Sequence, residues 1–156
     1  MTEIAGESIA DRVLRHPFFA GVDPTLVHAM VSKAEERTYA VGEMLVHEGR
    51  AAEEFFLVEE GKVALEVGGG DRAVITVETI GRGELLGWSW LVPPFRWRFD
   101  ARAIKPTQAI AINAAAARYA LAAHPAHAYQ FLIKFLPVIA ERLENTRVQL
   151  LDIHGR

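Results

Sequence analysis

The residues best suited to binding a small molecule lie in the second half of the chain, around its three tryptophans. Trp88, Ser89 and Trp90 are consecutive, and Trp97 follows after a short proline-containing stretch. Indole rings can stack on a planar ligand or hold a cation against their faces, while a serine at a helix start can donate to an anion or simply cap the helix. Alternatively the rings belong to the hydrophobic core, which we expect of at least one of them.

The pattern around Trp97 predicts which side chains of this stretch face inward. From residue 96 to residue 103 polar and apolar types alternate strictly, so the two sets lie on opposite faces of a β-strand. A bulge near Pro93 and Pro94 would reverse the faces and turn Arg96 inward, which is the open alternative. Without a bulge, the interior face carries Trp97, Phe99, Ala101 and Ala103, and the solvent face carries Arg96, Arg98, Asp100 and Arg102.

The composition of the chain excludes several other kinds of site. The 156 residues amount to one domain, 51% of them are apolar, and the formal net charge of −3 disfavours binding to DNA, RNA or anionic membranes. Without cysteine there is no disulfide, thiolate metal site or cysteine nucleophile. The N-terminus lacks a signal-peptide pattern, and Asn113 and Arg118 interrupt the most apolar later stretch, so no segment is expected to span a membrane. A single-domain cytoplasmic protein is predicted.

The elements that position these residues change type along the chain. Asp23 and Pro24 are typical of a helix start and predict a short helix to about residue 34. Between residues 36 and 112 recurrent glycines separate runs of strand length, and residues 68–71 are typical of a hairpin loop. Asn113 suits the cap of a helix over about residues 114–122, and a longer helix is expected from Pro125 to Asp152.

These elements predict a mainly β fold with flanking helices. N-terminal helices (1–35) precede an antiparallel jelly-roll β-roll (36–112), and the chain ends in C-terminal helices (113–156), the last of them long.

Three segments in a fixed order resemble a known family. Residues 41–49 (VGEMLVHEG) are similar to its opening hairpin, residues 56–63 (FLVEEGKV) to its third strand, and residues 81–87 (GRGELLG) to the entry of its phosphate-binding cassette. The family is the cyclic nucleotide-binding domain of bacterial catabolite-activator-type regulators, and the resemblance extends from about Pro17 to Leu151.

The resemblance implies a specific ligand chemistry. In that family a glycine-initiated short helix presents backbone N–H groups to a cyclic phosphate, a glutamate after the last glycine holds the ribose hydroxyl, and an inward-pointing arginine pairs with the phosphate. Here Trp88 stands at the glutamate position and Trp97 at the arginine position. We therefore expect cyclic AMP to bind weakly or not at all, and the ligand to be a cyclic nucleotide held unusually or another small molecule. The expected contacts are Leu86, Gly87, Trp88, Ser89, Trp90, Arg96, Trp97 and Arg98.

Metal chemistry is a weaker alternative. Cupins share the jelly-roll architecture and bind metals through clustered histidines and a carboxylate from neighbouring strands. Here only His47 lies in the β region, because the other histidines are on the flanking segments. No serine–histidine–acid arrangement, P-loop or dinucleotide-binding glycine motif is present, so no catalytic residue and no metal ligand are predicted.

The long C-terminal helix has apolar residues for two roles. Phe131 and Phe135 suit packing on the roll, while the stripe beyond Leu143 suits pairing with a second copy. The whole stripe, at steps of three and four, is Leu132, Phe135, Ile139, Leu143, Thr146, Leu150 and Ile153.

These patterns together predict a non-enzymatic regulatory or sensor module that forms a homodimer. In the regulators a helix-turn-helix follows the long helix, and none follows Arg156, so DNA reading is not expected and the module is expected to act on an unknown downstream protein. A ligand-free interaction module is the alternative, and a cupin-like metalloenzyme is the third.

Overall fold

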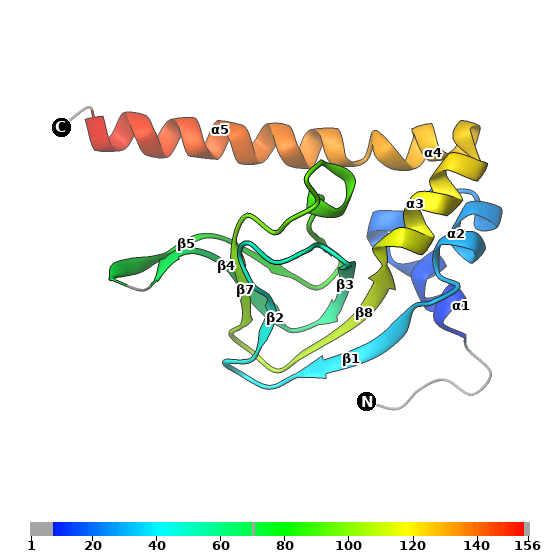
Figure 1. The fold of residues 1–156 in the computed structure, drawn as a ribbon, viewed down its shortest axis with the longest axis horizontal. Coiled ribbons are helices and arrows are strands. Elements are labelled where there is room, and N and C mark those ends of the chain that lie inside the picture. Colours follow the sequence, from blue (N-terminus) through cyan, green and yellow to red (C-terminus); the bar gives the residue numbers. More distant parts are fainter. Residues whose placement is uncertain (1–7, 70, 155–156) are drawn as a thin grey trace.

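The computed structural model of the chain describes residues 8–69 and 71–154. Helices precede and follow a region of strands (Figure 1). The first helices are α1 (Ile9–Arg15), the 3₁₀ helix η1 (Pro17–Phe19) and α2 (Pro24–Met30). The strands are β1 (Glu35–Tyr39), β2 (Met44–Val46), β3 (Glu54–Glu60), β4 (Lys62–Gly69), β5 (Arg72–Gly81), β6 (Leu85–Leu86), β7 (Asp100–Ala103) and β8 (Thr107–Asn113), with the 3₁₀ helix η2 (Ser89–Leu91) after β6. The last helices are α3 (Ala114–Ala123), α4 (Pro125–Leu132) and α5 (Phe135–His154).

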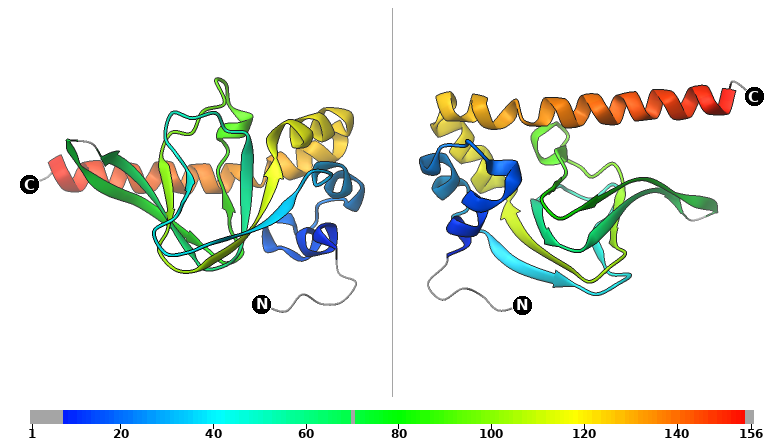
Figure 2. Two further views of the ribbon diagram at one scale, coloured as in Figure 1. Left: turned by 60° about the horizontal axis from the view of Figure 1, so that its bottom comes forward. Right: turned by 180° about the vertical axis from the view of Figure 1, so that it is seen from behind.

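The strands form two four-stranded sheets with the orders β1-β8-β3-β6 and β2-β7-β4-β5. All the paired strands are antiparallel, and strands far apart in sequence are neighbours, as in a jelly roll. The N-terminal helices and α3 gather at one end of the roll, while α5 runs along its side (Figures 1 and 2). The predicted fold class, a β-roll followed by a long C-terminal helix, is confirmed.

Two of the predicted helix starts are capped as their residue types indicated. The Asp23 side chain accepts from the Thr25 N–H at 2.8 Å, and the Asn113 side chain accepts from the Ala116 N–H at 2.8 Å. Helix α2, however, ends at Met30 rather than near residue 34. The chain must leave the helix there because β1 begins pairing with β8 at Glu35.

The single long helix predicted from Pro125 is in fact two helices, separated at Ile133 and Lys134. Pro137 explains the break. It has no N–H to donate to the Ile133 carbonyl, and its ring would clash with that carbonyl in a continuous helix. The Ile133 carbonyl instead accepts from the Leu136 N–H, at 3.2 Å, in a tighter turn.

The predicted hairpin loop at residues 68–71 joins β4 to β5. Gly68 and Gly69 both have positive φ angles, of 100° and 93°. A Cβ atom on Gly68 would overlap the carbonyl of Ala73, so a glycine is required there. Gly70, which belongs to the same prediction, lies outside the described residues.

The N-terminal helices are anchored to β3 by two buried polar side chains. Arg12 forms ion pairs with Glu59 and, at 2.7 Å, with Glu36, and these carboxylates raise the pKa of the Arg12 guanidinium. His16 Nε2 lies 3.1 Å from the Val58 carbonyl oxygen, while Nδ1 accepts from the Phe18 N–H at 3.2 Å. These contacts place the proton of a neutral ring on Nε2. Burial lowers the pKa of His16 below its ordinary value of 6.5.

This burial predicts a loss of stability in mild acid. Above pH 6.5 His16 is neutral in both states; below it the unfolded chain takes up a proton that the folded chain resists, so unfolding becomes easier. As the pH decreases below 6.5, the free energy of unfolding should therefore decrease by up to about 1.4 kcal/mol per pH unit because of this one group.

Chemical denaturation at pH 7.5 and below 6.5 measures this effect. His16→Gln should flatten the pH dependence, whereas the control His28→Gln, on an exposed side chain, should leave it unchanged. Equal pH dependence in His16→Gln and the unmodified protein would contradict the assignment.

Candidate functional site

Gly87 and Trp97 are in direct contact at the end of β6. Gly87 has a φ angle of 93°, in the region that favours glycine. A Cβ atom added at Gly87 would lie 2.6 Å from Cη2 of Trp97 and closer still to Cζ3. The six-membered ring of Trp97 therefore covers the glycine, and Trp97 is only 5% exposed.

The arginines on either side of Trp97 are exposed. Arg96 donates from Nη1 to the Gly49 carbonyl at 2.9 Å, and Arg98 is likewise on the solvent side. The faces therefore follow the predicted alternation without the bulge that would have turned Arg96 inward.

The strand predicted from Arg96, however, begins only at Asp100. Before it, the Trp97 N–H donates to the Arg50 carbonyl at 2.9 Å, and the Trp97 carbonyl accepts from the Gly49 N–H at 2.8 Å, so both groups bond to the turn and not to the sheet.

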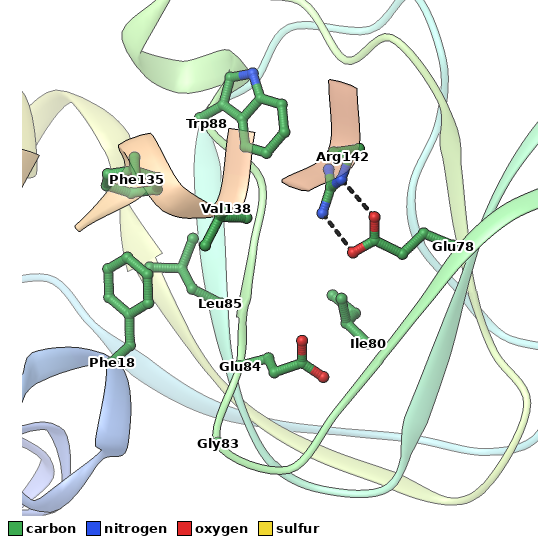
Figure 3. A pocket seen from close by; sticks show the side chains of 10 residues that line it. All are labelled: Phe18, Glu78, Ile80, Gly83, Glu84, Leu85, Trp88, Phe135, Val138 and Arg142. Atoms are coloured by element: carbon green, nitrogen blue, oxygen red, sulfur yellow. Dashed lines mark hydrogen bonds and ion pairs between the residues drawn. The ribbon is translucent and has the colours of Figure 1, made fainter. Parts of the chain in front are cut away.

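Trp88 follows Gly87 in the chain and faces α5. The guanidinium of Arg142 on α5 lies over its ring, 4.4 Å from the centroid. Arg142 also forms two hydrogen bonds with Glu78 on β5, Nε to Oε1 at 2.6 Å and Nη2 to Oε2 at 2.7 Å. A carboxylate, a guanidinium and an indole from three separate elements are thus joined (Figure 3).

A cavity of about 200 Å³ lies beside this cluster, between the roll and α5 (Figure 3). The cavity was not predicted from the sequence, although one signal is present: Phe135, Val138 and Arg142 recur at helical spacing and share a face. What the sequence did not show is that Glu78, on β5, lies opposite them. The lining residues are Phe18, Glu78, Ile80, Gly83, Glu84, Leu85, Trp88, Phe135, Val138 and Arg142.

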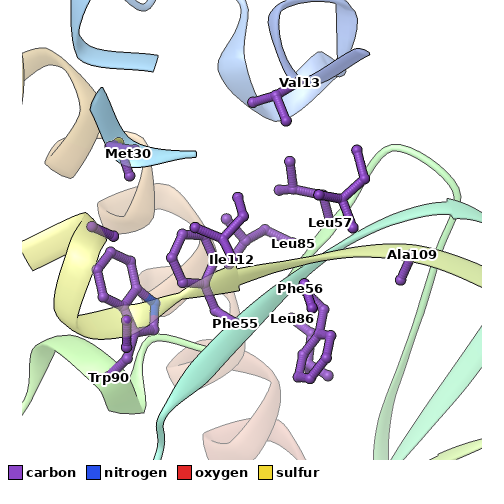
Figure 4. Packing of buried hydrophobic residues seen from close by; sticks show 14 of the residues in the cluster. Val13, Met30, Phe55, Phe56, Leu57, Leu85, Leu86, Trp90, Ala109 and Ile112 are labelled. Atoms are coloured by element: carbon purple, nitrogen blue, oxygen red, sulfur yellow. The ribbon is translucent and has the colours of Figure 1, made fainter. Parts of the chain in front are cut away.

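The third tryptophan belongs to the core, as expected of at least one of them. Trp90 is fully buried, its ring is stacked on Phe55 with centroids 4.1 Å apart, and its Nε1 donates to the Gly87 carbonyl at 3.1 Å (Figure 4). Leu86 is also fully buried. Ser89 is the first residue of η2 rather than its cap, and it is buried as well.

The three indoles consequently lie in three different surroundings. Trp88 borders the cavity at α5, Trp90 packs on Phe55, and Trp97 borders a separate pocket of about 150 Å³ with His47 and Arg50 on its walls. Of the predicted contact residues, the structure brings Trp90 and Trp97 together at Gly87 and leaves Arg96 and Arg98 exposed.

Residues 8–69 and 71–154 hold neither a metal-ion cluster nor a membrane-spanning helix. No group of three histidine, aspartate or glutamate side chains in this part of the chain could hold a metal ion. None of the helices that the structure describes is long and apolar enough to cross a membrane.

Comparison of the sequence with known families gives a match over more than half of the chain. Residues 36–124 match the family described as the cyclic nucleotide-binding domain. The chain belongs to this family. The resemblance to catabolite-activator-type regulators is therefore confirmed, while comparison with curated protein sequences finds no match.

Solved structures of three bacterial proteins have a similar fold. A protein of Geobacter metallireducens GS-15 described as cyclic nucleotide-binding is 24% identical, with a TM-score of 0.75 over 88% of this chain and 99% of that one. The catabolite activator protein of Thermus thermophilus is 25% identical, with a TM-score of 0.66 over 86% of this chain and 61% of that one. The sensor domain of the transcriptional regulator DNR from Pseudomonas aeruginosa is 15% identical, with a TM-score of 0.70 over 85% of this chain and 89% of that one.

Proposed function

We propose that the chain is a non-enzymatic regulatory module whose phosphate-binding position is filled by its own Trp97. The observation that carries the proposal is the contact between the Trp97 ring and Gly87, at the end of the segment that resembles the family's cassette. A cyclic phosphate at this position would have to displace a side chain that is only 5% exposed. Its usual arginine partner would also be absent, because Arg96 and Arg98 face solvent.

The second departure concerns the ribose. Trp88 stands where the resemblance places a carboxylate, and its ring is in contact with Arg142 of α5. Each lost charge-assisted hydrogen bond costs about 1.5–3 kcal/mol, so two of them weaken binding by two orders of magnitude or more. Cyclic AMP is therefore not the signal that this module reads.

A thermal-shift screen tests this proposal. A ligand of the native state must raise the melting temperature by mass action. Cyclic AMP and cyclic GMP at about 1 mM should leave it unchanged, since a Kd in the millimolar range or weaker gives almost no stabilisation. A saturable rise at micromolar cyclic nucleotide would contradict the proposal.

We also propose that the module is a homodimer paired through α5. Phe135, which the sequence placed on the apolar stripe, is 4% exposed and packs on Phe18, so it belongs to the core of its own roll. Leu136 takes its place and is 61% exposed. With it the stripe follows steps of four and three along the free side of the helix, the spacing of a coiled-coil seam. Its exposed apolar residues on α5 are Leu136, Ile139, Leu143 and Leu150, while Leu132, the first residue of the predicted stripe, belongs to α4.

Placing one charge on this stripe should separate the two copies. Leu143 is 62% exposed in a single chain, and Leu143→Asp would put like charges opposite each other in a two-fold seam. Light scattering should give twice the 17.3 kDa of one chain for the unmodified protein and 17.3 kDa for Leu143→Asp.

The matched control is Asn145→Asp, which adds the same charge at an exposed position of α5 outside the stripe and should remain dimeric. An unmodified protein that is monomeric at high concentration would contradict the proposed dimer.

A further inference from the structure

The cavity between the roll and α5 has the size and walls of a site for a one-ring molecule. Its volume is about 200 Å³, and an apolar cavity of about 150 Å³ is known to hold benzene. Side chains of η1, the roll and α5 form its apolar walls. They are Phe18, Ile80, Leu85, Phe135 and Val138, with Trp88 at one side (Figure 3).

The charges around the cavity favour a cation over an anion. Two carboxylates, Glu78 and Glu84, border it, and Arg142 is the one cationic side chain among the lining residues. The lining therefore carries one negative charge in excess. Glu84, which supplies the excess, is exposed, whereas Glu78 is part-buried, so the excess weakly disfavours a phosphate or carboxylate and favours an organic cation.

A cation already occupies one side of this site, and it belongs to the protein. The guanidinium of Arg142 is held between the ring of Trp88, at 4.4 Å, and the carboxylate of Glu78, at 2.6 and 2.7 Å. An indole face and a carboxylate that converge on one planar cation form a complete recognition site for such a group.

We propose that the cavity binds a small aromatic cation of the amidinium or guanidinium type. The ring of this ligand fills the apolar cavity, and its charged end replaces Arg142 on Glu78 and Trp88. The exchange changes the free energy of the charged groups little, because the ligand forms the contacts with Glu78 and Trp88 that Arg142 loses, and the released guanidinium is hydrated again. The net gain comes from the apolar walls that the ring covers.

Ligand binding would be transmitted to α5. Arg142 links that helix to β5 through Glu78, so its displacement removes a contact between the helix and the roll. That the signal passes through α5 rests on the proposed regulatory function, whereas the binding of the cation itself does not. A ligand can shift the helix only by its differential affinity for the two arrangements.

Calorimetric titration of the full chain with three matched probes tests the ligand class. Benzamidinium carries the planar cation, benzamide is its neutral counterpart and benzoate its anionic one. Benzamidinium should bind at least about tenfold more tightly than benzamide, because only the cation pairs with Glu78, and benzoate should not bind. Equal binding of benzamidinium and benzamide, or no binding of benzamidinium at all, would overturn the proposal.

Variants identify the site. Arg142→Gln removes the internal competitor and should tighten benzamidinium binding about tenfold, while Glu78→Gln should weaken it about tenfold. Trp88→Leu, which removes the indole face, should also weaken it. The control Arg147→Gln, at an exposed arginine of the same helix paired with Glu144, should leave affinity unchanged. Circular dichroism checks that each variant is folded.

The outcomes separate this inference from the proposed function. Weaker benzamidinium binding in Arg142→Gln would overturn the exchange. An equal rise for benzamide in that variant would show that the cavity has merely opened, and would overturn the cation site. Tight binding of cyclic AMP beside the expected benzamidinium results would contradict the proposed function alone.

Discussion

Trp90→Ala is expected to lower the free energy of unfolding by about 3–5 kcal/mol, the range for removing a fully buried large aromatic side chain. Trp90 is fully buried and stacked on Phe55 at 4.1 Å, with Phe131 and Phe135 also in ring contact. The substitution would leave a cavity among these rings. It would also remove the donor that serves the Gly87 carbonyl.

Urea denaturation measures this loss directly. Tyr129→Ala is the matched control, because it truncates an aromatic side chain that is 67% exposed and should change stability by no more than about 0.5 kcal/mol. A loss below about 1 kcal/mol for Trp90→Ala would show that Trp90 is not part of a close-packed core.

The second large effect concerns the ligand. The double variant Trp97→Arg with Trp88→Glu should raise the affinity for cyclic AMP by about two orders of magnitude or more, since it supplies both charged partners that the family's chemistry requires. Trp97→Arg also removes the ring that covers Gly87. Tryptophan fluorescence follows the titration, because Trp90 remains in the variant.

The matched control separates charge from space. Trp97→Met with Trp88→Glu opens the position above Gly87 without adding a cation, and its affinity should rise by less than about tenfold. If the affinity of this control for cyclic AMP rises as much as that of the arginine variant, the space above Gly87 and not the missing charge limits binding. If the affinity of the arginine variant does not rise, Trp97 does not stand at the phosphate position.

Much of the fold follows from local sequence signals. The side chains of Asp23 and Asn113 cap helices because these residue types compete well for free N–H groups, whatever lies around them. The placement of Trp97 inside and of Arg96 and Arg98 outside follows from strict alternation, a two-residue period that needs no knowledge of the partner strand.

What the sequence did not show depends on contacts between distant residues. Glu78 and Arg142 meet only because α5 folds back along the roll, and neither residue marks the other locally. Phe135 packs on the roll, which was one of its two predicted roles, but the place of Leu136 on the exposed stripe depends on the turn at Ile133 and Lys134, which shifts the helix face that follows. The signal for that turn, Pro137, was in the sequence but was not used.

Trp97 occupies the phosphate position and Arg96 stays outside, so cyclic AMP should find no arginine in the pocket. Calorimetric titration of the unmodified protein and of Arg96→Ala with cyclic AMP measures this. We expect no saturable binding below about 1 mM for either protein, because the exposed Arg96 does not reach the site. Micromolar binding by the unmodified protein that is abolished in Arg96→Ala would show instead that Arg96 turns inward and that Trp97 does not fill the phosphate position.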